Sequence, residues 1–186
     1  RMVFTRHESM ISTTKRHPAS MRGSLAAGSD GRIVGMTFEG KFNTGAYASW
    51  GPTVATRVPI HASGPYRVPH YLAEAHAIHT SGPTAGAFRG FGVPQATILQ
   101  EIMMDRLALD LGIDRLDIRR RNALLDGDRT VCGQQLHGVG IAECLDALAP
   151  AWEEAGPRIA AFNAEHSTVK RGLGAVSYTH LTLPTK

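Results

Sequence analysis

The chain has 186 residues, 42% of them hydrophobic and 19% charged, which is typical of a globular domain that buries a core. Its formal net charge is +4, but the basic residues are scattered along the sequence, which argues against a nucleic-acid-binding protein. No apolar run approaches the roughly 20 residues that span a bilayer, so we expect no membrane segment. Cys132 and Cys144 form neither a metal motif nor a disulfide framework, which favours reduced thiols in a cytoplasmic protein.

The first part of the chain predicts an antiparallel hairpin. Residues 1–5 resemble the end of a strand that is followed by a turn. Alternation from Met21 to Leu25 predicts a strand, and Ser29-Asp30-Gly31-Arg32 is a hairpin turn signal. The next strand is expected to bury one face and expose the other. The first face carries Val34, Met36, Phe38 and Phe42, and the second carries Thr37, Glu39 and Lys41.

The middle of the chain predicts one short helix and another strand. Pro52 suits a first helical position, so residues 53–57 are expected to form a short helix or turn. Residues 71–80 are expected to form a strand, which Ser81-Gly82-Pro83-Thr84 ends.

The second half predicts helices. Residues 93–111 have helical periodicity, and Gly112 stands where a helix C-terminal glycine belongs. The expected apolar stripe of that helix comprises Leu99, Ile102, Met103, Leu107 and Leu111. Asp114 predicts the N-cap of a helix to about residue 124, with Arg119-Arg120-Arg121 on a solvated face. A further helix is expected within residues 138–156, with Ile141, Cys144, Leu145 and Leu148 on one side, and Pro157 is expected to open another.

The chain reads as a fragment with an artificial end. It has no initiator Met and opens in the middle of an element. Residues 176–186 match nothing before them and resemble the in-frame translation of a transposase-type sequencing adapter. We therefore take residues 1–175 as the native domain and exclude residues 176–186 from the interpretation.

The most unusual stretch is Ala87-Phe88-Arg89-Gly90-Phe91-Gly92-Val93-Pro94-Gln95. Its glycines allow tight turns and close approach of another group to the backbone, and Pro94 presets the first turn of a helix. Backbone N–H groups at such a junction are free to bind an anion or an oxo group. The alternative is a purely structural loop that its two phenylalanines anchor.

Arg57 is the charged residue that stands out elsewhere, because it lies in an apolar stretch from Val54 to Ile60. An arginine in such surroundings usually needs an anionic partner. The alternative is a surface arginine whose aliphatic stem is buried. The nine histidines give no zinc-binding spacing, so we expect no metal ligation by histidine.

The central loop resembles the signature of one enzyme family. Alanine-phenylalanine-arginine-glycine-phenylalanine-glycine followed by Pro94-Gln95 is similar to the molybdopterin-binding large subunits of the xanthine dehydrogenase/aldehyde oxidase family. The likeness extends over most of residues 1–150. It includes the motifs Arg6-His7-Glu8-Ser9-Met10, Arg16-His17-Pro18, Phe42-Asn43-Thr44-Gly45-Ala46-Tyr47, Gly64-Pro65-Tyr66-Arg67-Val68-Pro69 and Ile118-Arg119-Arg120-Arg121-Asn122.

The resemblance assigns roles to five residues. Phe88, Arg89 and Gly90 would contact the molybdenum–molybdopterin cofactor, with the backbone of Arg89 near the metal. Phe91 would pack against an aromatic substrate, and Arg57 would polarise a substrate oxygen and stabilise negative charge that develops on the substrate. The expected cofactor is the cytosine dinucleotide form. FAD and 2Fe–2S clusters would lie on partner subunits or missing domains of an oligomer.

The implied reaction is oxidative hydroxylation of a purine-like N-heteroaromatic substrate, with water as the oxygen source. The alternatives are an aldehyde or other heteroaromatic dehydrogenase of the same family, and a non-catalytic basic binding domain. The general-base glutamate of such enzymes lies outside this chain, so we expect the fragment alone to be inactive. The expected fold class is α+β, with antiparallel hairpin strands and packed helices that form part of a molybdopterin-binding domain.

Overall fold

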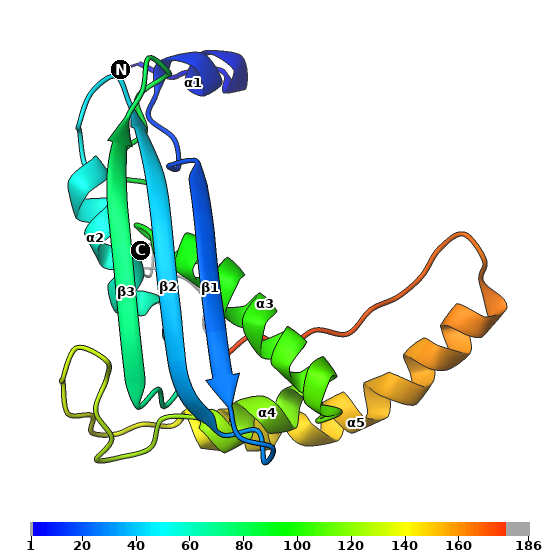
Figure 1. Cartoon of the computed structure of the whole chain (residues 1–186). Helices are drawn as coiled ribbons and strands as arrows, with labels where there is room; N and C mark the ends of the chain where they lie inside the picture. The colour runs from blue at the N-terminus through cyan, green and yellow to red at the C-terminus, as the bar shows by residue number, and fades with distance from the viewer. Residues whose placement is uncertain (1, 178–186) are drawn as a thin grey trace.

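The computed structural model describes residues 2–177, which are built around a three-stranded sheet (Figure 1). The strands β1 (Ala19–Ala27), β2 (Ile33–Gly45) and β3 (His70–His79) lie in the order β1-β2-β3. β1 and β2 form the predicted antiparallel hairpin. β3 pairs parallel to β2, which requires a crossover connection that includes helix α2 (Gly51–His61). The predicted α+β class is therefore confirmed, with a mixed sheet in place of an entirely antiparallel one.

Helices α2 and α3 (Val93–Leu111) cover one face of the sheet (Figure 1). Met36, Phe38 and Phe42 are buried there, as predicted. The prediction was wrong for Val34, which is 49% exposed. An irregularity in the strand pairing at Ala26/Ala27 shifts the alternation by one residue, so that Ile33 points inward instead.

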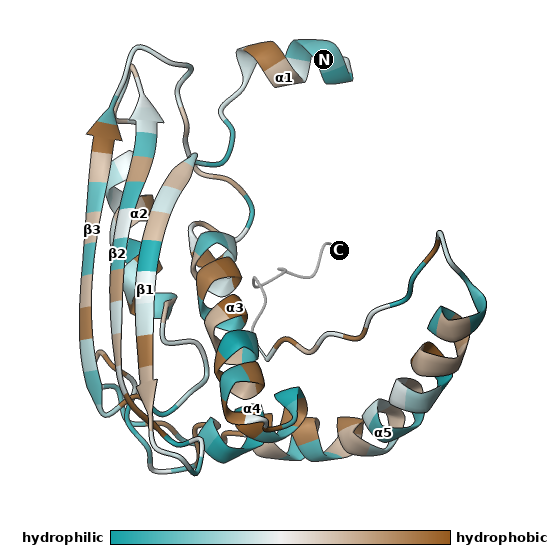
Figure 2. Cartoon of the chain, turned by 45° about the vertical axis from the view of Figure 1, so that its right-hand side comes forward, coloured by the Kyte–Doolittle hydropathy of each residue, from teal (hydrophilic) through white to brown (hydrophobic). Residues whose placement is uncertain are grey.

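The other face of the sheet is open to solvent in the described part of the chain. Thr37, Glu39 and Lys41 lie on it, as predicted, and hydrophilic and hydrophobic bands alternate along the strands (Figure 2). The hydroxyls of Ser24 and Thr37 are 2.6 Å apart across β1 and β2. Polar side chains thus share this face with Leu72, which pairs with Thr37 and is 71% exposed.

Helix α3 has the predicted bounds and ends at Gly112, whose φ of 65° is left-handed. Its predicted stripe was partly wrong, because Ile102 is 62% exposed. The deepest line of the helix is Ala96, Gln100, Met104 and Ala108. Because Gln100 is buried in this line, the face of α3 that packs on the sheet differs from the face that its apolar residues alone predict.

The first residues form a helix rather than the predicted strand end and turn. Helix α1 (Arg6–Ser12) is closed by a capping box, in which Thr5 accepts from the Glu8 amide and the Glu8 carboxylate accepts from the Thr5 amide. None of its residues is buried. The Thr-x-x-Glu pattern was readable from the sequence and was missed.

The C-terminal helices lie at the opposite end of the sheet from α1 (Figure 1). Helix α4 (Arg115–Asn122) has the predicted cap, since the Asp114 carboxylate accepts from the amides of Leu116 and Asp117. Helix α5 (Ile141–Glu165) runs through Pro157, which was predicted to open a separate helix. A proline removes one hydrogen bond and kinks a helix without having to end it. On the predicted apolar side Leu145 is buried, but Cys144 and Leu148 are exposed.

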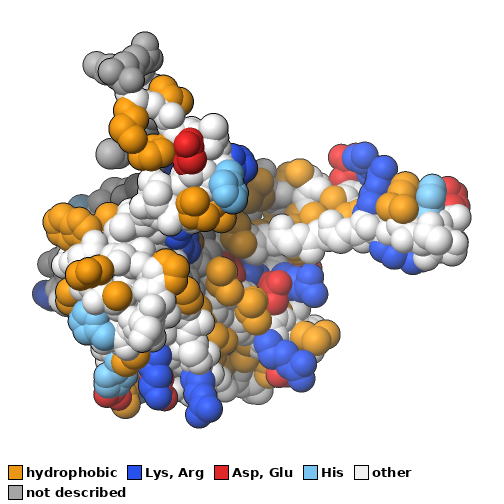
Figure 3. Space-filling view, turned by 90° about the horizontal axis from the view of Figure 1, so that it is seen from above, with side chains coloured by type: hydrophobic (Ala, Val, Ile, Leu, Met, Phe, Trp, Pro, Cys, Tyr) orange, Lys and Arg blue, Asp and Glu red, His pale blue; other side chains and the backbone are white. Residues whose placement is uncertain are grey.

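Of the segment that we regard as non-native, residues 178–186 lie outside the described residues, so this boundary stays a prediction. Within residues 2–177, no helix is both long and apolar enough to cross a bilayer. Figure 3, viewed from the α1 end, shows Lys and Arg side chains at several separate places on that face.

The prediction of a solvated face was wrong for Arg119, the first residue of the arginine run. Its side chain is fully buried, with Nη2 2.6 Å from Glu101 Oε2 and 2.8 Å from Asp105 Oδ1. The Tyr66 hydroxyl donates to Glu101 Oε1 over 3.1 Å. Burial raises the pKa of Tyr66, and the neighbouring Glu101 carboxylate raises it further. This buried polar network ties α4 to α3 and to the segment before β3.

Candidate functional site

The loop before α3 consists of two overlapping tight turns. The Phe91 amide donates to the Phe88 carbonyl over 2.8 Å, and the Val93 amide donates to the Gly90 carbonyl over 2.9 Å. Gly90 has φ of 86° and Gly92 has φ of 98°, values that suit glycine. Phe91 also has a positive φ, 47°, which is strained for an aromatic residue. Such strain persists mainly where surrounding structure and function require it.

The loop presents backbone donors without acceptors. In the described part of the chain, the amides of Arg89, Gly90 and Gly92 donate to no acceptor. The α3 helix that follows has Pro94 in its first turn and no side-chain cap. Free amides beside a helix N-terminus can bind an anion or an oxo group, which is the chemistry that the sequence predicted for this stretch.

Arg57 lies on α2 and reaches the loop. Its guanidinium carbon is 5.9 Å from the centroid of the Phe91 ring, close enough for a cation–π interaction. The Trp50 ring approaches Phe91 edge-on at 6.0 Å. No carboxylate among residues 2–177 pairs with Arg57, and its side chain is exposed, so the structure favours the surface-arginine alternative. The structure thus brings together the two residues that the resemblance placed at the substrate.

His61 lies one turn after Arg57 and holds its guanidinium. His61 Nε2 is 3.3 Å from Arg57 Nη2. Burial lowers the pKa of His61, and the positive charge of Arg57 lowers it further. A neutral imidazole is therefore favoured, and its unprotonated nitrogen can accept a hydrogen bond from Arg57.

Arg16 and Gln95 contact the loop or each other beside it, and neither residue was assigned a role from the sequence. Arg16 donates to the Arg89 carbonyl and, over 3.2 Å, to Gln95 Oε1, and its guanidinium carbon lies 5.0 Å above the Phe88 ring. Gln95 is buried and donates to the His17 carbonyl over 3.4 Å. Both residues belong to the motifs that carry the resemblance, which was the available signal. Phe88 and Arg89 are themselves exposed.

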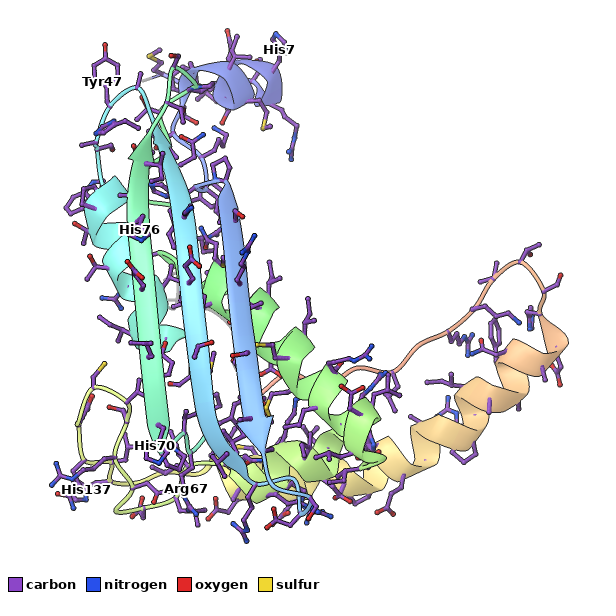
Figure 4. The ribbon with its side chains drawn as sticks, viewed as in Figure 1. His7, Tyr47, Arg67, His70, His76 and His137 are labelled. Carbon is purple, nitrogen blue, oxygen red and sulfur yellow. The ribbon has the colours of Figure 1, made fainter. Side chains whose placement is uncertain are left out.

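The histidines are dispersed over the molecule. His7 and Tyr47 lie at one end of the sheet, whereas His70 and His137 lie at the other, beside Arg67 (Figure 4). Among residues 2–177, no three His, Cys, Asp or Glu side chains are grouped so that they could hold a metal ion.

Comparison with known proteins decides the family. The model of the molybdopterin cofactor-binding domain matches residues 1–123. The chain belongs to this family, within the large subunits of xanthine dehydrogenases and aldehyde oxidoreductases. The predicted resemblance is thereby confirmed, and the chain is homologous to molybdenum-dependent oxidoreductases.

The molybdopterin-domain relatives are much longer than this chain. The nicotinate dehydrogenase large molybdopterin subunit of Eubacterium barkeri is 45% identical over 147 residues, which are 78% of this chain and 35% of the relative. The putative xanthine dehydrogenase molybdenum-binding subunit of Escherichia coli K12 is 33% identical over 99% of this chain and 25% of its own length. The chain thus spans about a quarter to a third of these two relatives.

Solved molybdenum-enzyme structures share the fold. Aldehyde oxidoreductase from Desulfovibrio gigas superposes with a TM-score of 0.81 at 28% identity, over 85% of this chain and 17% of that one. Quinoline 2-oxidoreductase from Pseudomonas putida 86 gives 0.78 at 26% identity, over 88% of this chain and 22% of that one. The domain fold is therefore conserved between enzymes whose names denote different substrates.

The residues of the loop fit the cofactor that the family implies. The unpaired amides of Arg89, Gly90 and Gly92 are donors for an oxygen or sulfur acceptor. Gly90 and Gly92 also let such a group approach the backbone closely. The assignment of Phe88, Arg89 and Gly90 to cofactor binding stays a prediction that this geometry supports.

Proposed function

We propose that the subunit containing this chain is the catalytic subunit of a molybdenum hydroxylase that acts on a purine-like N-heteroaromatic substrate. The observation that carries the proposal is the approach of Arg57 to the Phe91 ring at 5.9 Å. An aromatic face beside a cation suits a flat heteroaromatic ring that bears an electronegative oxygen. Phe91 from the loop would hold the ring by stacking, and Arg57 from α2 would hold that oxygen by its charge.

In this proposal the bound molybdenum cofactor supplies a two-electron oxidation in which water provides the oxygen. The chain's own residues bind and orient. The amides of Arg89 and Gly90 would donate hydrogen bonds to the cofactor, and Phe91 would stack on the substrate ring. Arg57 stabilises negative charge that develops on the substrate oxygen, and His61 holds its guanidinium in place.

The rest of the enzyme is proposed by analogy with the family. Electrons would leave through 2Fe–2S clusters to FAD on partner subunits or further domains, in a cytoplasmic oligomer. The pterin would be the cytosine dinucleotide form. The names of the relatives, which specify a large or a molybdenum-binding subunit, support a multi-subunit organisation.

A nicotinate-like substrate is the second candidate within the same chemistry. It is favoured by the 45% identity to the large subunit of a nicotinate dehydrogenase. Arg57 would then pair with the substrate carboxylate, as a guanidinium does well. A simple aldehyde offers neither a heteroaromatic ring nor a carboxylate, so it would gain little from Arg57.

The test uses the full-length subunit, expressed with its partner subunits. We expect Arg57→Ala to lower kcat/KM for the true heteroaromatic substrate roughly 10- to 100-fold, because a hydrogen bond to a charged group is lost. The assay compares xanthine, hypoxanthine, nicotinate and a small aldehyde, and quantifies molybdenum in each preparation. Arg22→Ala, an exposed arginine on the open face of the sheet, is the matched control and should change neither quantity.

The outcomes separate the candidates. Purine turnover that falls in Arg57→Ala while molybdenum stays bound supports the purine proposal, and the same pattern with nicotinate supports the second candidate. Aldehyde turnover that is indifferent to Arg57 would replace both with an aldehyde dehydrogenase. A wild-type complex that contains no molybdenum would refute the enzymatic proposal.

A further inference from the structure

We propose that Arg16 is a positioning residue that aims the Gly90 N–H at an oxygen or sulfur acceptor of the bound cofactor. This inference rests on the proposed function. It concerns a residue that lies 73 positions before the loop in the sequence and touches it from outside.

The Arg16 guanidinium engages the loop at three points. One nitrogen donates to the Arg89 carbonyl, the other donates to Gln95 Oε1 over 3.2 Å, and the guanidinium carbon lies 5.0 Å from the Phe88 ring centroid. Gln95 is only 4% exposed and is anchored in turn on the His17 carbonyl. Gln95 thus anchors one guanidinium nitrogen while the other holds the Arg89 carbonyl. Burial lowers the pKa of Arg16 without removing its charge.

The carbonyl that Arg16 holds belongs to the same peptide unit as the Gly90 amide. A trans peptide is planar, and its C=O and N–H point in opposite directions. When the Arg89 carbonyl points toward Arg16, the Gly90 N–H must point away from it. That N–H donates to no acceptor within the described residues, so it remains available as a donor.

The neighbouring carbonyls do not need Arg16. The Phe88 carbonyl accepts from the Phe91 amide, and the Gly90 carbonyl accepts from the Val93 amide, so the turn itself orients both units. The Arg89 carbonyl lies between them and has no backbone donor among residues 2–177. Because Gly90 has φ of 86° and tolerates many conformations, this central peptide is the one that could rotate at little cost.

The charge of Arg16 adds a second effect. A charge-assisted hydrogen bond at the carbonyl oxygen polarises the peptide unit and makes its N–H a better donor. Arg16 would therefore both aim the Gly90 N–H and strengthen it. Loss of Arg16 would therefore weaken the hydrogen bond from Gly90 to a bound acceptor, although Arg16 itself does not contact that acceptor.

The experiment uses the full-length subunit with its partners and the variants Arg16→Met, Arg16→Lys and Arg22→Ala. Methionine keeps the aliphatic stem but cannot donate, and lysine keeps one charged donor for the Arg89 carbonyl. We measure thermal unfolding, molybdenum content, kcat and KM, and the molybdenum(V) electron paramagnetic resonance spectrum. In Arg16→Met we expect a folded protein with shifted resonance positions or lost molybdenum, and kcat lowered about tenfold.

The pattern across variants distinguishes positioning from packing. Arg16→Lys should lie between Arg16→Met and wild type, free guanidinium at sub-denaturing concentration should partly restore Arg16→Met, and Arg22→Ala should match wild type. If Arg16→Met retains the wild-type molybdenum content, spectrum and kcat, the inference is wrong. If Arg16→Lys is impaired as fully as Arg16→Met, donation to the Arg89 carbonyl is not the cause, and the inference is also wrong.

Two further outcomes are covered. If Arg16→Met does not fold, the variant Gln95→Leu provides the test, because it leaves Arg16 in place but removes its buried anchor. An unchanged molybdenum(V) spectrum in Gln95→Leu refutes the inference. A smaller shift in the same direction than the one expected for Arg16→Met supports it. If the wild-type complex contains no molybdenum, the proposed function fails and the inference fails with it. A loaded wild type with unaffected variants refutes the role of Arg16 alone.

Discussion

Replacing Arg119 with alanine is expected to lower the free energy of unfolding by about 3–5 kcal/mol, because removal of one partner of a buried ion pair leaves the other charge uncompensated. Glu101 would lose the donors of Arg119 that lie 2.6 and 2.8 Å from its Oε2 atom. The other side-chain donors to Glu101, from Tyr66 and Gln100, are neutral and would not compensate its charge. Equilibrium urea unfolding of this chain measures the change.

The neighbouring residue provides a matched control for Arg119→Ala. Arg120 carries the same charge on the same helix, but its side chain is 40% exposed and pairs with Asp117 and Asp146 at the surface. Arg120→Ala is expected to cost only about 0–1 kcal/mol. Equal losses for the two variants would show that the Arg119–Glu101 pair is not protected from solvent.

Replacing Gly92 with alanine is expected to damage both stability and the site. The residue has φ of 98°, which costs an alanine about 1–3 kcal/mol. Its Cβ would also lie 2.9 Å from Val58 Cγ2 and 3.0 Å from the Val54 carbonyl oxygen, and such overpacking typically costs a further 1–3 kcal/mol. Because Arg57 lies between these two valines on α2, relief of the clash would separate Arg57 from Phe91.

Gly112→Ala is the control for Gly92→Ala. Both glycines flank α3 and have left-handed backbones, but a Cβ at Gly112 would meet nothing within 4 Å. We expect about 1–2 kcal/mol for Gly112→Ala and normal molybdenum content in the full-length subunit. Gly92→Ala should lose more stability in urea and should also lose molybdenum or substrate turnover. Equal stability and equal molybdenum content in the two variants would mean that α2 and the loop can move apart at little cost in free energy.

The parts of the fold that depend on local signals were predictable. The β1–β2 hairpin follows from strand alternation and the Asp30-Gly31 turn, and the bounds of α3 follow from Pro94 and Gly112. The parallel pairing of β3 with β2 was not predictable, because strand alternation does not identify the partner or its direction. Arg119 was assigned to solvent because its neighbours are arginines, whereas its partner Glu101 lies on another helix.

The candidate site could be proposed from the sequence to the extent that one continuous motif carries it. The residues from Phe88 to Phe91 stand together in the sequence, so their unusual composition was visible at once. Arg57 attracted attention as a charge among apolar residues, although it proved to be exposed. Nothing in the spacing indicated that Arg16 would hold the Arg89 carbonyl, because that contact exists only after the chain has folded.

The crossover between β2 and β3 also determines the order in which the strands pair during folding. A hairpin with a short turn, such as β1–β2, forms in about 1–10 μs. β3 can pair with β2 only after residues 46–69 have been ordered. The conformational entropy of that connection is therefore lost before the β2–β3 pairing contributes any stabilising free energy. Arg57 lies within that connection and Phe91 lies beyond β3, so the two meet late in folding. In pulsed hydrogen exchange, amides of the hairpin should accordingly gain protection before those that pair β3 with β2, and the reverse order would contradict this sequence of events.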